Sequence, residues 1–207
     1  MSDPIQPAVP DFTNRDPNSP QFWDERFEQR FTPWDQAGVP SAFRAFAARH
    51  PGAAVLIPGC GSAYEALYLA EHGNPVRAID FAPAAVAAAS AQLGERHAHL
   101  VEQADFFAYE PPFAPAWIYE RAFLCALPLA MRTGYARRVA ELLPAGALLA
   151  GFFFLGATPK GPPFGIERSE LDALLAPDFE LIEDEAVTDS IPIFAGRERW
   201  MTWRRRG

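Results

Sequence analysis

Short apolar runs alternate with stretches of helical periodicity along most of the chain. The apolar runs predict strands at 55–58, 76–79, 97–103, 116–124, 147–155, 179–187 and 199–205. Apolar residues at helical spacing predict helices at 22–27, 41–50, 83–93, 128–143 and 167–175. Strands that alternate with helices are typical of a doubly wound α/β fold, whose ligand crevice lies at the carboxyl ends of the strands. The run at 147–155 is apolar on both faces, so we expect a central strand there.

Residues 1–20 differ from the rest of the chain because Pro, Asp, Asn and Ser dominate them. Such a segment buries little, so we expect it to be loose or to order only against the domain. We expect one domain over 21–207, in which residues 21–50 form a helical lid and a leading helix. The aromatic residues of that lid are Trp23, Phe27, Phe31 and Trp34. They either cover the edge of the sheet or form a wall over a cofactor or substrate.

The clearest chemical signal is a glycine turn between the strand at 55–58 and the next helix. Gly59 and Gly61 allow the backbone to turn tightly and to approach a ligand, and N–H groups at the start of the helix then face that ligand. Asp80 ends the next strand about 20 residues later, where a carboxylate accepts hydrogen bonds from ribose hydroxyls. This pattern predicts an adenosine-containing cofactor.

Two other readings of the turn remain open at this point. A nicotinamide-linked oxidoreductase also uses a glycine turn and an acid at a strand end, but Tyr64 stands where that motif has its third glycine. A non-catalytic module that only binds the cofactor is the second alternative.

Composition narrows the range of partners. The chain has 207 residues and a net charge of −8, and a nucleic-acid surface normally needs a basic face, so we expect no nucleic-acid partner. No apolar run is long enough to span a membrane, and no basic, then apolar, leader precedes the first helix. Cys60 and Cys125 lie in apolar or glycine-rich contexts, which disfavours a disulfide framework. We therefore expect a cytoplasmic protein. We also expect a monomer, because the sequence shows no heptad pattern that would demand a partner.

Several motifs together resemble the thiopurine methyltransferase superfamily, and within it the branch of small halide, thiocyanate and thiol methyltransferases. They are Phe22-Trp23-Asp24, Thr32-Pro33-Trp34-Asp35, Gly59-Cys60-Gly61-Ser62, Asp105-Phe106-Phe107 and Arg121-Ala122-Phe123-Leu124-Cys125-Ala126-Leu127-Pro128. The likeness runs from about residue 22 to the C-terminal strand. It implies a class I methyltransferase fold, Rossmann-like, with seven strands of which the last is antiparallel. It also implies S-adenosylmethionine as the methyl donor and no metal.

The resemblance assigns roles to individual residues. It implies cofactor contacts by Trp23, Phe27, Trp34, Gly59, Gly61, Asp80, Phe81, Asp105, Phe106 and Arg121. Trp34 and Arg121 are the implied catalytic residues. The candidate substrate contacts are Arg121, Phe123, Phe194 and Arg197, with the loop at 161–164 as a candidate mouth. Many relatives have Gly where this chain has Ala63, so we expect cofactor binding to survive with less room under the cofactor.

The implied reaction is an in-line displacement of a methyl group from sulfonium to a soft anion, which needs alignment rather than a general base. The sequence agrees with this expectation, because its four histidines (His50, His72, His97 and His99) lie away from every motif above. Halide, thiocyanate, hydrosulfide and thiol are the expected acceptors, and a thiopurine or another aromatic thiol is the alternative. Cys60 is expected to be a small packed residue.

Overall fold

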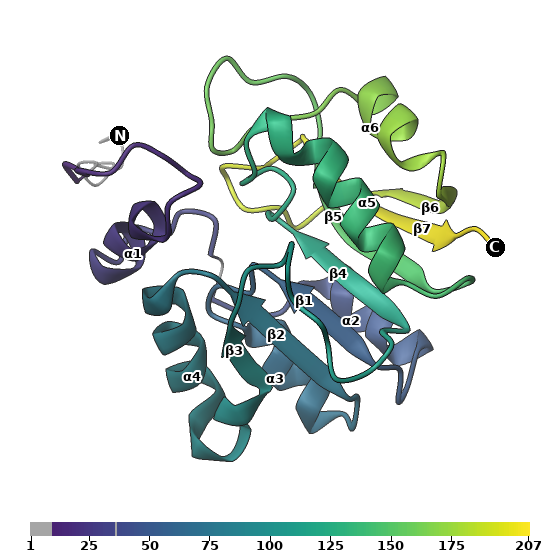
Figure 1. Ribbon diagram of the computed structural model, residues 1–207, viewed down its shortest axis with the longest axis horizontal. Coiled ribbons are helices and arrows are strands. Elements are labelled where there is room, and N and C mark those ends of the chain that lie inside the picture. Colours follow the sequence, from purple (N-terminus) through teal and green to yellow (C-terminus); the bar gives the residue numbers. More distant parts are fainter. Residues whose placement is uncertain (1–9, 36) are drawn as a thin grey trace.

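The computed structural model describes residues 10–35 and 37–207, and they form one seven-stranded sheet with helices on both faces (Figure 1). The strand order is β3-β2-β1-β4-β5-β7-β6. The strands are β1 (Val55–Pro58), β2 (Val76–Asp80), β3 (Val101–Gln103), β4 (Trp117–Arg121), β5 (Leu148–Phe154), β6 (Phe179–Ala186) and β7 (Glu198–Arg205). The α-helices are α1 (Pro20–Glu28), α2 (Ser41–Arg49), α3 (Tyr64–Glu71), α4 (Pro83–His97), α5 (Arg132–Leu142) and α6 (Arg168–Leu175).

Strands β1 to β5 are parallel, and β7 lies between β5 and β6, antiparallel to both. The expected class I sheet with an antiparallel last strand is therefore confirmed. β5 is central, as its two apolar faces predicted. The strand order reverses between β1 and β4, and the ligand crevice of such folds lies at this point.

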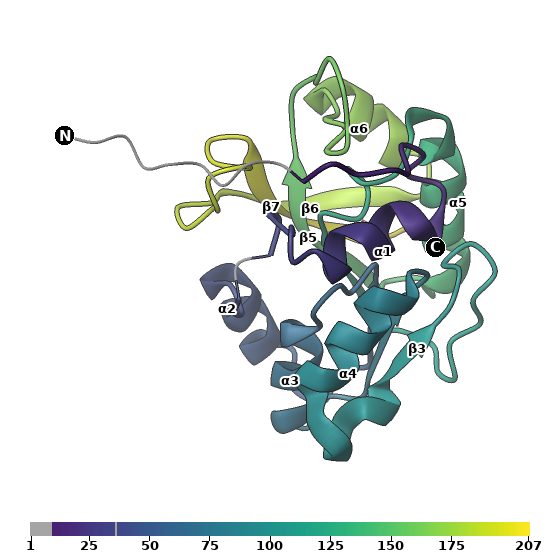
Figure 2. The same cartoon turned by 90° about the vertical axis from the view of Figure 1, so that its left-hand side faces the viewer.

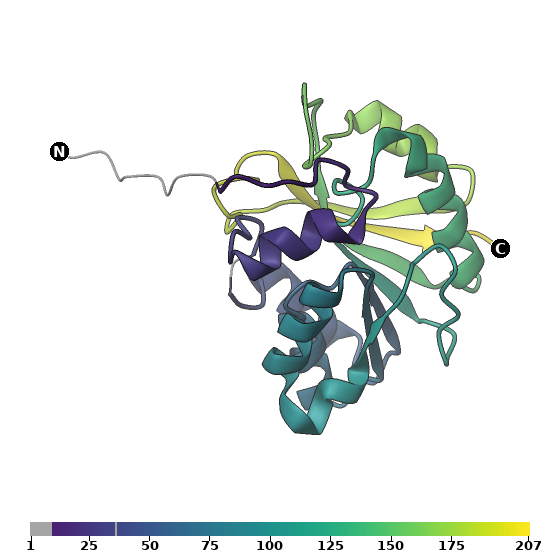
Figure 3. The same ribbon diagram turned by 60° about the vertical axis from the view of Figure 1, so that its left-hand side comes forward.

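Two hydrophobic clusters hold the layers together, one on each face of the sheet. Helices α2, α3 and α4 bury Phe43, Leu69 and Leu93 on one face, and α5 and α6 bury Val139 and Leu171 on the other. Alternate residues of each strand serve the two clusters, because successive side chains of a strand point to opposite faces. Figures 2 and 3 show this division, with α1 crossing in front of the sheet.

Two predicted strands differ from the observed ones by more than one residue at an end, and the helix predicted at 128–143 is shorter, because residues 129–131 form a 3-10 helix and α5 begins at Arg132. The strand predicted at 97–103 is reduced to Val101–Gln103, because His97 still belongs to α4 and Ala98–Leu100 form a 3-10 helix. The strand predicted at 116–124 ends at Arg121, because Ala122 takes a left-handed backbone conformation with φ of 56°.

The described part of the N-terminal segment packs on α1 as a strap, which we define as residues 10–19. Phe12 is buried, and the N–H of Thr13 donates to Glu25 Oε2 over 2.8 Å. The indole N–H of Trp23 donates to the carbonyl of Pro17 over 3.0 Å. Figure 3 shows the strap running alongside α1. Residues 1–9 of the segment expected to be loose lie outside the described residues.

The lid helix is joined to the sheet domain through a second helix. Asp24 Oδ1 accepts the N–H of Ala84 over 2.8 Å, at the first turn of α4. A carboxylate at this position satisfies a free N–H and faces the positive end of the helix dipole. None of the helices that the structure describes has the length and apolar character needed to cross a bilayer.

Candidate active site

A cavity of about 870 Å3 lies between α1, the strap and the carboxyl ends of the central strands. Its volume lies within the range of about 300–1,000 Å3 typical of small-molecule sites. With one exception, Arg197, every site residue predicted from the sequence lines it. The lining residues are Trp23, Phe27, Trp34, Gly59, Gly61, Asp80, Phe81, Asp105, Phe106, Arg121, Phe123 and Phe194.

The glycine turn forms the floor of this cavity. Gly59 and Gly61 both have positive φ values, 59° and 51°, which glycine adopts without strain. The N–H of Gly61 donates to Asp80 Oδ2 over 3.1 Å, so the end of β2 fixes the turn that follows β1. The turn is thereby held open toward the cavity.

Asp80 is the buried acid at the end of β2. Its Oδ1 also accepts the N–H of Ala82 over 3.0 Å. Burial raises the pKa of Asp80 to about 6, against the lowering effect of these backbone hydrogen bonds. The carboxyl is thus ionised at neutral pH and can accept hydrogen bonds from a diol.

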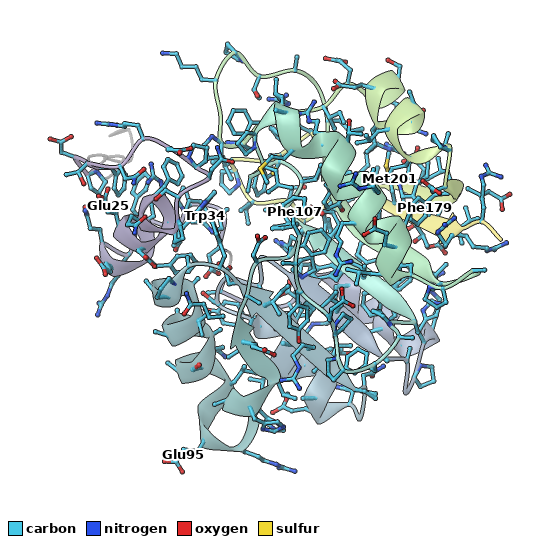
Figure 4. All side chains as sticks on the ribbon, viewed as in Figure 1. Glu25, Trp34, Glu95, Phe107, Phe179 and Met201 are labelled. Atoms are coloured by element: carbon cyan, nitrogen blue, oxygen red, sulfur yellow. The ribbon has the colours of Figure 1, made fainter. Side chains whose placement is uncertain are left out.

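The walls beside Asp80 suit an adenine ring. Phe106 is 4% exposed and makes an edge contact with Phe123, their centroids 5.2 Å apart. Asp105 accepts the N–H of Phe107 over 3.0 Å, and this exposed residue also lines the cavity. Figure 4 shows Phe107 in the segment after β3, opposite the lid.

The lid closes the other side with aromatic rings. Trp34 meets Trp23 edge to face at 5.5 Å and Phe27 at 6.2 Å between centroids. It also packs on the small cluster that contains Cys125 and Phe194. Trp34 lies on the side of α1 that faces the sheet (Figure 4). Aromatic faces are favourable surroundings for a cationic group such as a sulfonium.

These features together fit S-adenosylmethionine. The cavity offers a buried carboxylate that can accept hydrogen bonds from a ribose, apolar rings that can flank an adenine, and aromatic rings that suit a sulfonium. The turn contributes no side chains of its own at Gly59 and Gly61, so its backbone can approach a ligand closely.

Arg121 is part of a buried charged cluster rather than a free cation. Its Nη1 lies 3.5 Å from Glu65 Oε1, and the hydroxyl of Tyr119 donates to the same oxygen over 3.1 Å. The guanidinium also lies over the ring of Phe152 at 5.0 Å. Burial raises the pKa of Glu65, and Arg121 opposes that effect. The sequence reading did not single out Glu65, since only the fold brings the first turn of α3 to the end of β4.

Arg197 is the predicted substrate residue that the structure does not bring into the cavity. Its guanidinium donates to the carbonyls of Leu155 over 3.0 Å and Ala157 over 3.2 Å, and it also donates to the carbonyl of Gly156. All these donors are used by backbone acceptors. Arg197 therefore fixes the loop after β5, and it is not among the residues that line the cavity.

A second buried acid, Glu120, lies beneath the wall and was not predicted from the sequence. It accepts the N–H groups of Phe123 and Leu124 over 3.0 and 2.9 Å, and the hydroxyl of Tyr135 over 2.7 Å. Burial raises its pKa to about 7. These bonds place Phe123 against the glycine turn.

The carboxylates that line the described cavity all have hydrogen-bond or ion-pair partners. Asp80 binds backbone N–H groups and Glu65 faces Arg121, while Asp35 accepts the N–H of Ala37 and the hydroxyl of Ser62. None of the four histidines lines the cavity within the described residues. Burial raises the pKa of the free thiols Cys60 and Cys125, so both stay protonated.

Comparison with known proteins places these observations in a family. Residues 18–206 match the thiopurine S-methyltransferase (TPMT) family. Thiocyanate methyltransferase 1 of Arabidopsis thaliana is 26% identical over 191 residues, which cover 88% of this chain and 84% of that protein. A thiopurine S-methyltransferase of Shewanella putrefaciens is 30% identical over 193 residues, which cover 78% of this chain and 84% of that protein.

Solved structures show the same fold. The 1,6-didemethyltoxoflavin-N1-methyltransferase of Burkholderia thailandensis, solved with S-adenosylhomocysteine, superposes with a TM-score of 0.72 at 19% identity. The match covers 91% of this chain and 87% of that one. This similarity is one of fold, a class I methyltransferase sheet.

Proposed function

The chain belongs to the thiopurine S-methyltransferase family and is an S-adenosylmethionine-dependent methyltransferase, and from this premise we propose that it methylates small soft sulfur nucleophiles. Thiols, hydrosulfide and thiocyanate are the proposed sulfur acceptors, and halide ions are proposed as further acceptors because they are soft nucleophiles as well. The relatives named as thiocyanate and thiol methyltransferases support this choice. Family membership also sets aside the dinucleotide oxidoreductase and the non-catalytic module.

When bound, S-adenosylmethionine supplies an electrophilic methyl group carried on a positively charged sulfur. The glycine turn with Asp80 binds and orients the donor, and Trp23 and Trp34 exclude water above it. Arg121, fixed by Glu65, lies at the end of β4, where it can orient an approaching anion. Alignment of this kind is the main contribution that an in-line displacement requires.

We propose that transfer proceeds without a protein base, and one observation carries this proposal. Each carboxylate that lines the described cavity is already bonded to backbone N–H groups, a hydroxyl or Arg121, and no histidine lines it. A thiol must therefore arrive as the thiolate, whose concentration is set by its own pKa.

The pH dependence of turnover tests this proposal. At saturating donor, kcat/KM for thiocyanate or iodide should be flat from pH 6.5 to 9, because neither anion carries a proton to remove. For a series of thiols it should rise through the pKa of each thiol. A single rising limb shared by all acceptors, lost in Asp35→Asn or Glu65→Gln, would show that the protein supplies a base.

Arg121→Ala tests the role of Arg121, with Glu65→Gln as the matched variant that keeps the cation. Turnover of iodide should fall at least tenfold in Arg121→Ala and less in Glu65→Gln, because Arg121 then loses only one of its anchors. Unchanged iodide turnover in Arg121→Ala would remove this residue from the proposal.

An aromatic thiol such as a thiopurine is the second candidate acceptor. The cavity volume of about 870 Å3 favours it, since this space is large for a donor and a single ion. Relative kcat/KM values for iodide, thiocyanate and a bulky aromatic thiol decide between the two.

A further inference from the structure

The loop after β5, defined here as the 156–165 loop, forms part of the cavity wall. Lys160, Gly161, Pro162 and Pro163 of this loop line the cavity. In Figure 1 the loop extends from the end of β5 above the sheet before α6 begins.

Two arginines fix the ends of this loop. Arg197 binds the carbonyls at its start, as described above. The buried Arg132 donates to the carbonyls of Phe164 and Gly165 over 3.2 and 2.6 Å at its end. Both arginines thereby hold the ends of the loop in place.

A side chain inside the loop braces it further. The hydroxyl of Thr158 donates to the carbonyl of Pro163 over 3.0 Å and accepts the N–H of Gly165 over 2.9 Å. Gly165 has no room for a side chain, because a Cβ there would lie 1.8 Å from the carbonyl oxygen of Gly156. The backbone that carries Lys160 is thus held in place beside the cavity.

Four cationic side chains line the described cavity, and three of them are engaged. Arg15 pairs with Asp11 at 3.4 Å. Arg26 is stacked on the rings of Phe12 and Phe22, and Arg121 pairs with Glu65. The fourth, Lys160, is exposed and has no ion pair with any described residue.

We propose that Lys160 determines acceptor specificity by favouring thiols that carry a second, fixed negative charge, such as a carboxylate, over neutral thiols of the same size. This inference rests on the proposed methyl transfer to thiols. An ammonium group at a solvated cavity mouth raises the affinity for an anion several-fold, and added salt weakens this effect. The acid and the amide of one aromatic thiol, 4-mercaptobenzoate and 4-mercaptobenzamide, differ in this charge and in little else.

The test is the ratio of kcat/KM for the acid to that for the amide. The ratio cancels effects on methyl transfer that both acceptors share. We expect it to fall about 3- to 10-fold in Lys160→Gln, through KM, and to be kept in Lys160→Arg. Arg96→Gln, which removes one charge from an exposed site outside the cavity, is the matched control and should leave the ratio unchanged. An equal ratio in Lys160→Gln and the parent protein would overturn the proposal.

A direct binding measurement separates this inference from the proposed function. Calorimetry with S-adenosylhomocysteine present should show tighter binding of the acid than of the amide, and this difference should vanish in Lys160→Gln. If no thiol were turned over, the proposed function would fail. The binding measurement would still decide the role of Lys160, because it does not require turnover. Equal affinity for acid and amide in the parent protein would refute that role.

The chain offers a chemical control as well, because Lys160 is its only lysine. Acetylation removes the charge of the side chain, whereas reductive methylation keeps it. Acetylation should lower the acid-to-amide ratio as Lys160→Gln does, and methylation should preserve it. Lys160→Arg treated in parallel reports any effect of modifying the terminal amine. A ratio that acetylation leaves unchanged would contradict the proposal.

Discussion

Phe123 lies so close to Gly59 that a Cβ added to this glycine would stand 2.4 Å from Phe123 Cδ2. The contact joins the loop after β4 to the turn after β1 across the floor of the cavity. Gly59→Ala should therefore both strain the backbone, at φ of 59°, and displace the ring. We expect a loss of about 2–3 kcal/mol in the free energy of unfolding and at least a tenfold weaker affinity for the donor, measured by denaturation and calorimetry.

Gly73→Ala is the matched control, since Gly73 has φ of 79° and open space around its Cα. This substitution should lower the free energy of unfolding by only the backbone strain, about 1–2 kcal/mol, and leave the affinity for the donor unchanged. Equal effects of the two substitutions on donor affinity would show that the contact with Phe123 is unimportant.

Ala63 adopts the left-handed conformation, with φ of 55°, at the N-cap of α3. Its methyl group is buried, so Ala63→Gly relieves about 1 kcal/mol of strain but loses about 0.8 kcal/mol of burial. The two terms cancel, and we expect a change in melting temperature of less than about 2 °C.

Ala37→Gly provides the comparison, because Ala37 has φ of 48° but is exposed. Only the relief of strain applies there, so this variant should gain about 0.5–1 kcal/mol. A stabilisation of Ala63→Gly as large as that of Ala37→Gly would show that the buried methyl contributes nothing.

Glu120 should make the stability of the protein depend on pH. Its pKa is about 7 in the folded protein and 4.5 as the ordinary value, so the folded state binds more protons between these limits. The stabilisation is complete below about pH 4.5 and is lost as the pH rises through about 7, an effect of up to about 3 kcal/mol.

Glu120→Gln carries no titrating group, so its unfolding free energy should decline less between pH 5 and 8 than that of the parent protein. Asp80, with a pKa of about 6, contributes a decline of the same sign in both proteins. Parallel pH profiles in denaturant melts of the two proteins would contradict the assignment to Glu120.

The hydrogen bond from Ala84 to Asp24 predicts that the lid stabilises α4. Asp24→Ala should cost about 1 kcal/mol of unfolding free energy, and Asp24→Asn, whose amide oxygen can still accept the bond, should cost less. Hydrogen exchange at the N–H of Ala84 measures this effect directly. Equal protection of this N–H in all three proteins would show that the bond contributes nothing to α4.

The sequence predicted those features that depend on neighbouring residues along the chain. The strands around Gly59 and before Asp80 are apolar runs followed by turn residues, and such runs form buried parallel strands in most contexts. Residues 97–100 misled the prediction, because an exposed edge strand of three residues leaves little hydrophobic pattern to separate it from a helix end.

The parts of the site that escaped prediction depend on contacts between distant residues. Asp24 meets Ala84 across 60 positions, and Glu65 meets Tyr119 across 54. Arg197 was predicted as a substrate contact, but it does not line the cavity, and its guanidinium donates to the carbonyls of Leu155 and Ala157, which no sequence pattern reveals. Partners of this kind become visible only once the fold brings them together.

The bond between Asp24 and Ala84 also limits how the lid can be studied. Trimming the chain at residue 28 to open the active site would at the same time uncap a helix of the scaffold. If such a truncated protein were inactive, the loss could come from a destabilised domain as well as from the missing lid. Single substitutions on the face of α1 that lines the cavity separate these two effects better.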